Sequence, residues 1–299
     1  MFNGIVNLYK PAGFTSHDAV AKLRGIFGQK KIGHTGTLDP DAEGVLPICL
    51  GKATKVCELL TDRSKTYQAV MLLGRATDTQ DTSGETIFCS EKIAEEAEIR
   101  EVIGLFQGEQ MQIPPMYSAL KVNGRKLYEL AREGKTVERK ARKIQIDEIR
   151  IDKIELPRVT MTISCSKGTY IRTLCNDIGE KLGCGACMEH LLRTRVGEFS
   201  LEDCLRIEDL QEAKEAERLE DCLIQVDSLF ENYPGLSFLT EYSKYADNGN
   251  RLAQHMVKKM PKIDDKAMVR IYNEEGVFYG IYQYEEKSRD FKPVKRFKE

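Results

Sequence analysis

Residues 30–55 read KKIGHTGTLDPDAEGVLPICLGKATK and place one acid, Asp39, between a glycine-flanked histidine and an apolar run. Pro40 follows Asp39, and a residue before proline is driven into an extended, non-helical conformation. The acid is therefore expected on a stiff loop, next to the apolar run 45–50. The same residues are also typical of an ordinary turn between two strands, because turns attract Asp, Pro and Gly for local reasons. From the residues alone, both interpretations stay open.

Helices and strands interleave irregularly on both sides of this loop. Thr15 or Ser16 is expected to cap a helix, whose apolar face is formed at helical spacing by residues 20, 23 and 27. Further helical segments are expected at 53–60, 91–106, 126–134, 171–182 and within 201–230. Strands are expected at 4–10, 66–74, 140–151, 158–166 and 188–199, with a loop at 75–85. Because clean βαβ repeats are missing, this order predicts an α+β fold with a mixed, mostly antiparallel central sheet and flanking helices.

The last part of the chain has a pattern of its own. MVRIYN (268–273) and VFYGIYQYEE (277–286) predict short strands separated by polar turns. Tyr233–Pro234–Gly235 is the expected boundary. The sequence thus predicts a large domain over 1–232 and a small β-rich C-terminal domain over 233–299.

Composition excludes several classes of protein. The 299 residues are 41% hydrophobic and 31% charged, which is typical of a soluble globular protein with a sizeable core. The start of the chain does not have the pattern of a signal peptide, and no apolar run approaches the ~18 residues of a membrane span. We therefore expect a cytoplasmic protein that does not enter a membrane. The nine cysteines are scattered and odd in number, which predicts reduced thiols rather than a disulfide framework.

Charge is distributed unevenly along a chain whose net charge is only −2. Residues 121–143 carry nine Lys or Arg against three Glu, and they include an aromatic residue, Tyr128. Residues 198–231 carry three basic against twelve acidic side chains. A basic patch with an aromatic side chain can bind a phosphate backbone, although such a run is more often a solvated helix face.

The sequence contains no known cofactor signature. P-loops, glycine-rich dinucleotide fingerprints and serine nucleophile elbows are all missing. The four histidines include no pair at helical spacing, so we expect no metal site. The remaining candidates are Asp39, Tyr67 at the start of a strand, and Arg172 at the start of a helix. An arginine in contact with a buried aspartate favours the ionised acid, and an aromatic ring can hold an extruded nucleobase. A turn acid, a core tyrosine and a surface arginine are equally compatible with the spacing.

Five ordered blocks resemble a known family. They are LYKPAGFTSHDAV (8–20), GHTGTLDPDAEGVLPICLGKATK (33–55), SKTYQAVMLLGRATDTQDTSGE (64–85), IPPMYSALKVNGRKLYELAREG (113–134) and CSKGTYIRTLCNDIGEKLGCGACMEHLLRT (165–194). Together they resemble the bacterial tRNA pseudouridine synthases of the B family, which modify the uridine at position 55 in the T-arm loop of tRNA. The tail resembles only loosely the PUA-like RNA-binding module of such enzymes.

The resemblance implies roles for individual residues. Asp39 matches the catalytic aspartate, and Arg172 matches the arginine paired with it. His34 and Tyr67 match residues that contact the flipped nucleotide, with the Tyr67 ring stacked on the base. Two further pocket residues are matched by Tyr170 and Leu191.

The same resemblance assigns supporting segments. Lys10 and Pro11 match a motif that supports the active-site loop, and residues 121–143 match the thumb that closes over the T-arm. One position departs from the family pattern, because Leu192 stands where relatives usually have a second arginine. The absence of that cation is expected to weaken a phosphate contact without altering the reaction.

The implied activity is a cofactor-free isomerisation of the T-arm uridine to pseudouridine by a monomer that needs tRNA but no protein partner. Two alternatives stay open: a non-catalytic tRNA-binding or folding factor, and the same chemistry on another RNA. Whether Asp39 attacks the ribose, attacks the base or removes a sugar proton is likewise open.

Overall fold

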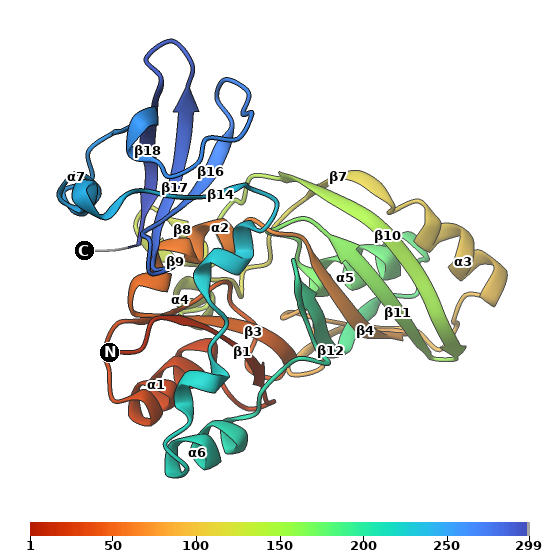
Figure 1. Cartoon of the computed structure of the whole chain (residues 1–299). Coiled ribbons are helices and arrows are strands. Elements are labelled where there is room, and N and C mark those ends of the chain that lie inside the picture. Colours follow the sequence, from red (N-terminus) through yellow and green to blue (C-terminus); the bar gives the residue numbers. More distant parts are fainter. Residues whose placement is uncertain (298–299) are drawn as a thin grey trace.

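The computed structural model describes residues 1–297, whose strands form one large sheet, one smaller sheet and two short hairpins (Figure 1). The large sheet contains β1 (Gly4–Lys10), β2 (Ile32–His34), β3 (Glu43–Leu50), β4 (Lys65–Leu73), β7 (Gly108–Gln112), β10 (Arg142–Glu155), β11 (Arg158–Cys165), β12 (Ala186–Val196) and β13 (Phe199–Ser200). Its order is β1-β3-β12-β4-β11-β10-β7, with β2 beside β3 and β13 beside β12.

The helices in the part of the chain that forms this sheet are α1 (Ser16–Phe27), α2 (Cys57–Thr61), α3 (Glu96–Gly104), α4 (Leu127–Arg132), α5 (Ile171–Lys181) and α6 (Ile207–Glu215). Short 3₁₀ turns are η1 (Gly51–Val56), η2 (Leu219–Cys222) and η3 (Val226–Phe230). Helices α1 and α6 pack with β1 and β3 around one apolar cluster, whereas α3 and α5 pack with β4, β10, β11 and β12 around another (Figure 1). The sheet therefore has two halves with separate cores.

A short parallel contact joins the two halves. Leu192 and Arg193 of β12 pair with Glu43 and Gly44 of β3, while all other neighbours in this sheet are antiparallel. Gly44 has φ +104°, and a Cβ there would lie 2.2 Å from the carbonyl oxygen of Arg193. Only glycine permits so close an approach of the two backbones. The predicted mixed, mostly antiparallel sheet with flanking helices is confirmed.

The smaller sheet is built from β14 (Gly235–Ser237), β15 (Leu252–Ala253), β16 (Met268–Tyr272), β17 (Phe278–Glu285) and β18 (Asp290–Arg296), in the order β14-β16-β17-β18-β15. Helix α7 (Ser243–Asp247) and the 3₁₀ turns η4 (Thr240–Tyr242) and η5 (Gln254–Met256) accompany it. Ile281 and Phe297 enter an apolar cluster that also contains Ile5 and Val45 of the large sheet. The two sheets thus share a core where they meet.

One expected loop contains strands. Residues 75–85 begin with β5 (Arg75–Thr77), which pairs antiparallel with β6 (Thr86–Cys89). The Thr/Asp/Gly composition correctly marks the turn between them but hides the short flanking strands. A second hairpin, β8 (Lys121–Val122) with β9 (Arg125–Lys126), leads into α4 in the basic segment. Within residues 1–297 no helix is both long and apolar enough to cross a membrane.

Candidate functional site

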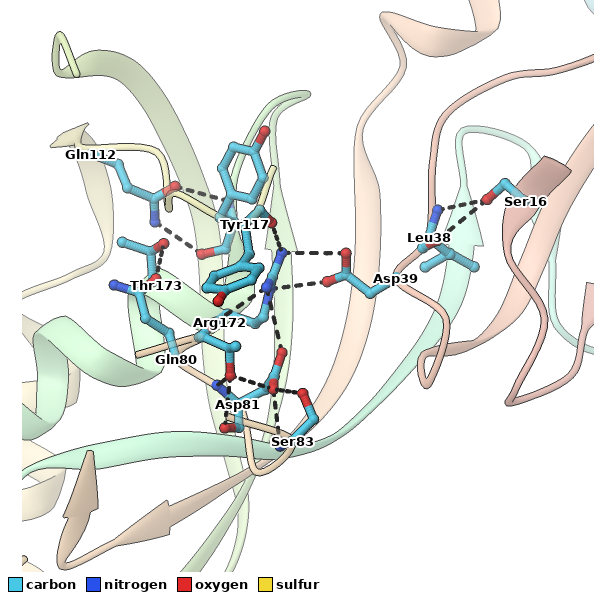
Figure 2. Close-up of polar contacts among 12 residues, drawn as sticks. Ser16, Leu38, Asp39, Gln80, Asp81, Ser83, Gln112, Tyr117, Arg172 and Thr173 are labelled. Atoms are coloured by element: carbon cyan, nitrogen blue, oxygen red, sulfur yellow. Dashed lines mark hydrogen bonds and ion pairs between the residues drawn. The ribbon is translucent and has the colours of Figure 1, made fainter. Parts of the chain in front are cut away.

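Asp39 lies in the loop between β2 and β3, and this loop is held from two sides. Helix α1 contributes Ser16, whose hydroxyl accepts a hydrogen bond of 2.9 Å from the amide of Leu38 (Figure 2). The buried ammonium of Lys10, at the end of β1, donates to the carbonyls of Pro11, Phe14 and Pro40 at 2.9, 2.6 and 3.0 Å. The backbone is therefore held on both sides of the acid, at Leu38 by Ser16 and at Pro40 by a charge-assisted hydrogen bond from Lys10.

Arg172, in the first turn of α5, meets Asp39 with two nitrogen atoms. Its Nε lies 3.0 Å from Oδ2 and its Nη2 lies 3.3 Å from Oδ1 of Asp39 (Figure 2). The guanidinium also donates to the carbonyls of Tyr117 and Thr79 and lies 3.4 Å from Asp81 Oδ2. The arginine is 6% exposed, so its orientation is fixed by protein partners rather than by water.

The surroundings of Asp39 oppose ionisation of its carboxyl, and nearby cations offset only part of this effect. Burial raises the pKa of this carboxyl above its ordinary value, Arg172 lowers it, and the nearby Asp81 raises it. Its side chain nevertheless keeps 39% of its surface open to solvent. An acid that is desolvated, paired with a cation and still accessible is a candidate for chemistry on an incoming molecule.

Tyr67 and Leu191 form an apolar wall beside this acid. Tyr67 lies on β4 directly opposite Arg193 of β12, and Leu191 lies opposite Ala69. Both side chains are buried in one cluster with Leu38, which immediately precedes Asp39. Burial raises the pKa of the Tyr67 phenol, and the Arg193 charge lowers it. The ring is thus a neutral surface close to the carboxylate.

Tyr170 comes directly before α5, and a glutamine fixes its backbone. Gln112 Oε1 accepts a hydrogen bond of 2.8 Å from the Tyr170 amide, and its Nε2 donates to the Tyr170 carbonyl at 3.0 Å. Burial raises the pKa of the Tyr170 phenol, while the charge of Arg172 lowers it. Tyr170 therefore belongs to the same group of residues as Asp39 and Arg172.

His34 ends β2 and is more remote from the ion pair. Its Nδ1 accepts a hydrogen bond of 3.3 Å from the Gly36 amide, and its ring meets that of His17 edge to face at 5.5 Å. Burial lowers the pKa of His34, and the neighbouring His17 and Arg193 lower it further. These surroundings favour the neutral imidazole, and when Nδ1 accepts a hydrogen bond the proton of a neutral ring is on Nε2. No hydrogen bond or ion pair within residues 1–297 joins it directly to Asp39.

Three residues of this site were missed by the sequence reasoning. Asp81 is a second carboxylate on Arg172, Gln112 holds Tyr170, and buried Arg193 donates to the carbonyls of Val45 and Gly36 at 2.7 and 3.4 Å. All three act across elements that are far apart in the chain. The only available signal was their position inside or next to the matching blocks.

The thumb, residues 121–143, has part of its positive charge neutralised by nearby glutamates. Glu133 pairs with Arg125 and with Lys135, and Lys143 lies 2.6 Å from Glu109 of β7. Lys126 and Arg132 both stack against the Tyr128 ring. Leu192, the departure from the family pattern, is half-buried in β12. Among residues 1–297, no group of three or more His, Cys, Asp or Glu is arranged to hold a metal ion.

Comparison with known proteins shows the family. Residues 24–171 match the model described as TruB family pseudouridylate synthase (N terminal domain), and residues 172–231 match that of the tRNA pseudouridylate synthase B C-terminal domain. Curated relatives named tRNA pseudouridine synthase B include one from Lachnoclostridium phytofermentans, 50% identical over 99% of both chains. The one from Bacillus subtilis is 41% identical over 94% of this chain and 93% of its own length.

A solved structure agrees with this assignment. A chain from a structure of an H/ACA RNP bound to a substrate RNA containing 2′-deoxyuridine superposes with a TM-score of 0.71 at 27% identity. The match covers 99% of this chain and 85% of the other. With its full-length relatives and two matched family models, this chain belongs to the TruB family of pseudouridylate synthases.

Proposed function

We propose that this protein isomerises the T-arm loop uridine of tRNA, at position 55, to pseudouridine, with Asp39 as the catalytic carboxylate. The observation that carries the proposal is the two-point contact between Asp39 and Arg172, at 3.0 and 3.3 Å, beside the buried ring of Tyr67. The curated relatives named above support tRNA as the substrate.

The atoms of the reaction balance without a cofactor. The bond from the ribose C1′ to uracil N1 breaks, and a bond from C1′ to C5 forms. The C5 hydrogen leaves and N1 gains one, so no electrons are lost or gained overall. Attack on the ribose, attack on the base and removal of a sugar proton all require an ionised Asp39. Arg172 favours that form against burial.

The detached uracil must stay in place while it turns. Tyr67 supplies a ring for the base to stack on, and Leu191 and Leu38 close the apolar side of the pocket and exclude water. Tyr170, whose backbone is fixed by Gln112, lines the same site. His34 donates from Nε2 to the RNA in this proposal, which is supported by the hydrogen bond that its Nδ1 accepts from Gly36.

The thumb and the C-terminal region are assigned to tRNA binding. We propose that the thumb closes over the T-arm and that residues 233–299 act as a PUA-like RNA-binding domain. Their basic side chains support this assignment, since cations neutralise phosphates. The protein would then act in the cytoplasm as a monomer without a protein partner.

The test uses unmodified transcribed tRNA labelled with tritium at uridine C5. Wild-type protein is expected to release tritium, and Asp39→Asn is expected to bind the tRNA within a few-fold but to release none. Asp41→Asn is the matched control, because Asp41 is an exposed acid in the same loop and should keep turnover within about threefold. Turnover by Asp39→Asn above a tenth of wild type would overturn the assignment of Asp39.

A second candidate is the same chemistry directed to another RNA, and the similarity to a chain of an RNA-bound H/ACA RNP favours it over a purely structural role. A T-arm hairpin without added protein or RNA separates the two. Product at the loop uridine supports the stand-alone tRNA enzyme. An untouched hairpin, with turnover only on other RNAs, supports the second candidate, and RNA binding without any tritium release supports a non-catalytic tRNA factor.

A further inference from the structure

Two cysteines on different elements, Cys49 and Cys57, lie close together beside Gly33 of β2. Cys49 lies in β3 and is fully buried, and its partner across the strand pair is Gly33 of β2. Directly opposite residues in an antiparallel pair point to the same face of the sheet. The side chain of Cys49 therefore lies on the face of the sheet where Gly33, which has no side chain, leaves space.

Cys57 fills the space over that glycine. It is the first residue of α2, and its Sγ lies 3.5 Å from the position that a Cβ on Gly33 would occupy. The sulfur of Cys57 thus lies beside Cys49, and the two thiols are close enough for each to alter the pKa of the other. Both side chains belong to the apolar cluster formed where the two sheets meet.

The two sulfurs are not equivalent. Interaction with Cys57 and burial raise the pKa of the Cys49 thiol, whereas interaction with Cys49 lowers the pKa of the Cys57 thiol. Lys295 of β18 lowers the pKa of Cys57 further. Cys57 is therefore the thiol of the pair that ionises more readily, and the thiolate is the nucleophilic form of cysteine.

Cys57 is also the accessible member of the pair. It is half-buried, whereas Cys49 is fully buried. An open hollow of about 550 Å³ lies at the junction of the sheets and is lined by Lys55, Glu58, Pro293, Val294, Lys295 and Arg296. Cys57 lies in the chain between the first two of these residues. Cys57 itself does not line this hollow, and a small oxidant reaches its sulfur through the part of Cys57 that is exposed.

We infer that Cys49 and Cys57 form a redox-modifiable site that closes to a reversible disulfide when the protein meets a peroxide. The Cys57 thiolate attacks one oxygen of hydrogen peroxide, the O–O bond breaks, and Cys57 becomes a sulfenic acid while hydroxide leaves and is protonated. The Cys49 thiol then attacks this sulfur, the S–O bond breaks, and a second water leaves. Two thiols and one peroxide give one disulfide and two waters, and a small-molecule thiol reverses the bond.

A second pair of cysteines lies close together, but neither thiol is accessible enough for us to expect it to react with peroxide. Cys175 of α5 and Cys187 of β12 are close enough for their charges to interact, but both are buried, and burial raises the pKa of each. The charge of Arg75 lowers the pKa of Cys187, but burial outweighs it. We therefore expect this pair to stay reduced under conditions that oxidise Cys57.

The chain is well suited to a direct test, because Lys52 and Lys55 lie between the two cysteines. Trypsin separates residues 32–52, which contain only Cys49, from residues 56–63, which contain only Cys57. The full-length protein is treated with hydrogen peroxide, remaining thiols are alkylated, and unreduced peptides are analysed by mass spectrometry. We expect these two peptides to be joined in most chains and to separate again after dithiothreitol.

Variants identify the order of events. Cys57→Ser should abolish the cross-link, and Cys49→Ser should leave a sulfenic acid on Cys57 that a dimedone-type probe labels at least tenfold above wild type. Cys222→Ser, which removes another half-buried thiol, should leave the cross-link unchanged. Oxidation of the wild type without the 32–52 to 56–63 cross-link, or pairing of Cys57 with another cysteine, would overturn the inference. This readout on the wild-type protein needs no turnover, so it is independent of the proposed function.

Discussion

The cations around Asp39 and the cations of the thumb differ in their burial and in the groups that they contact. Lys10, Arg172 and Arg193 are buried, and they donate to backbone carbonyls or carboxylates on other elements. The thumb cations are mostly exposed, and several pair with glutamates that are also exposed, as Lys143 does with Glu109. The first group is enclosed by protein, whereas the second faces water.

This difference separates two uses of the same side chains. A buried cation has few alternative partners, so its hydrogen bonds fix the backbone that accepts them, and removing it leaves acceptors without donors. Exposed ion pairs contribute only about 0–1 kcal/mol to stability because water and salt screen them. Substitutions in the first group are therefore expected to alter turnover or folding, and those in the thumb to alter RNA binding.

The largest effect is expected for Arg172→Lys. Lysine keeps the charge but cannot reach Asp39 with two nitrogens and the Tyr117 carbonyl at once. We expect turnover at pH 7 to fall by about 10²-fold, the loss typical of a misplaced reacting group. Because Arg172 lowers the pKa of Asp39 against burial, the variant's acid limb in kcat should also move to higher pH. Tritium release measured from pH 5 to 9 tests both effects.

A matched control keeps this result interpretable. Arg150→Lys changes an arginine paired with Asp152 on the exposed surface of β10 and should leave the pH profile unchanged. If Arg172→Lys retained both the rate and the acid limb of wild type, the buried cation would have no special role, and the contrast between the two groups would fail.

The sequence predicted the fold well where its signals are local. The helix after Thr15, the strand 66–74 and the loop at Asp39 all follow from capping, periodicity and the Asp–Pro pair, and each is present. The short strand β6 was missed, because its four residues are too few to show an alternation and all of them are exposed. Short strands depend on partners that the local sequence does not name.

The site was predicted less completely, for the same reason. Spacing alone could not distinguish Arg172 from a surface arginine, and only the family resemblance linked it to Asp39, 133 residues earlier. Asp81 and Arg193 were overlooked because their roles arise from packing between β5–β6, α5 and β12. Such contacts are set by the folded backbone, and neither residue type nor spacing encodes them.

An intermediate effect, on stability, is expected for Lys10→Met. The change leaves the carbonyls of Pro11, Phe14 and Pro40 without their donor, which should lower the free energy of unfolding by about 3 kcal/mol at pH 7. Urea unfolding of the two proteins measures this difference. A decrease of less than about 0.5 kcal/mol would place Lys10 with the thumb cations rather than with the buried group.

The pH dependence of unfolding in the same two proteins tests whether the Lys10 ammonium is desolvated. Burial lowers the pKa of Lys10 to about 8 from its ordinary 10.5. Between these values the folded protein binds fewer protons than the unfolded chain, so this group adds stability as pH rises. The advantage of wild type over Lys10→Met should therefore grow between pH 8 and 10. A constant difference would show that the lysine is not desolvated.

The smallest effect is expected in the thumb, where it should appear only in RNA binding. Lys121 and Lys140 are exposed and form no ion pair with any residue in the range 1–297, whereas Arg125 and Lys143 are already paired with glutamates. Replacing Lys121 and Lys140 by alanine should flatten the dependence of log K on log salt by about 0.9 for each phosphate that is no longer neutralised.

The matched Arg125 and Lys143 double variant should change the slope less, because those charges are partly neutralised before RNA arrives. Binding of a T-arm hairpin between 50 and 200 mM salt gives both slopes. Equal slopes in the two variants would mean that pairing with glutamates does not decide which thumb cations bind phosphate. The distinction between cations would then apply only to the buried group.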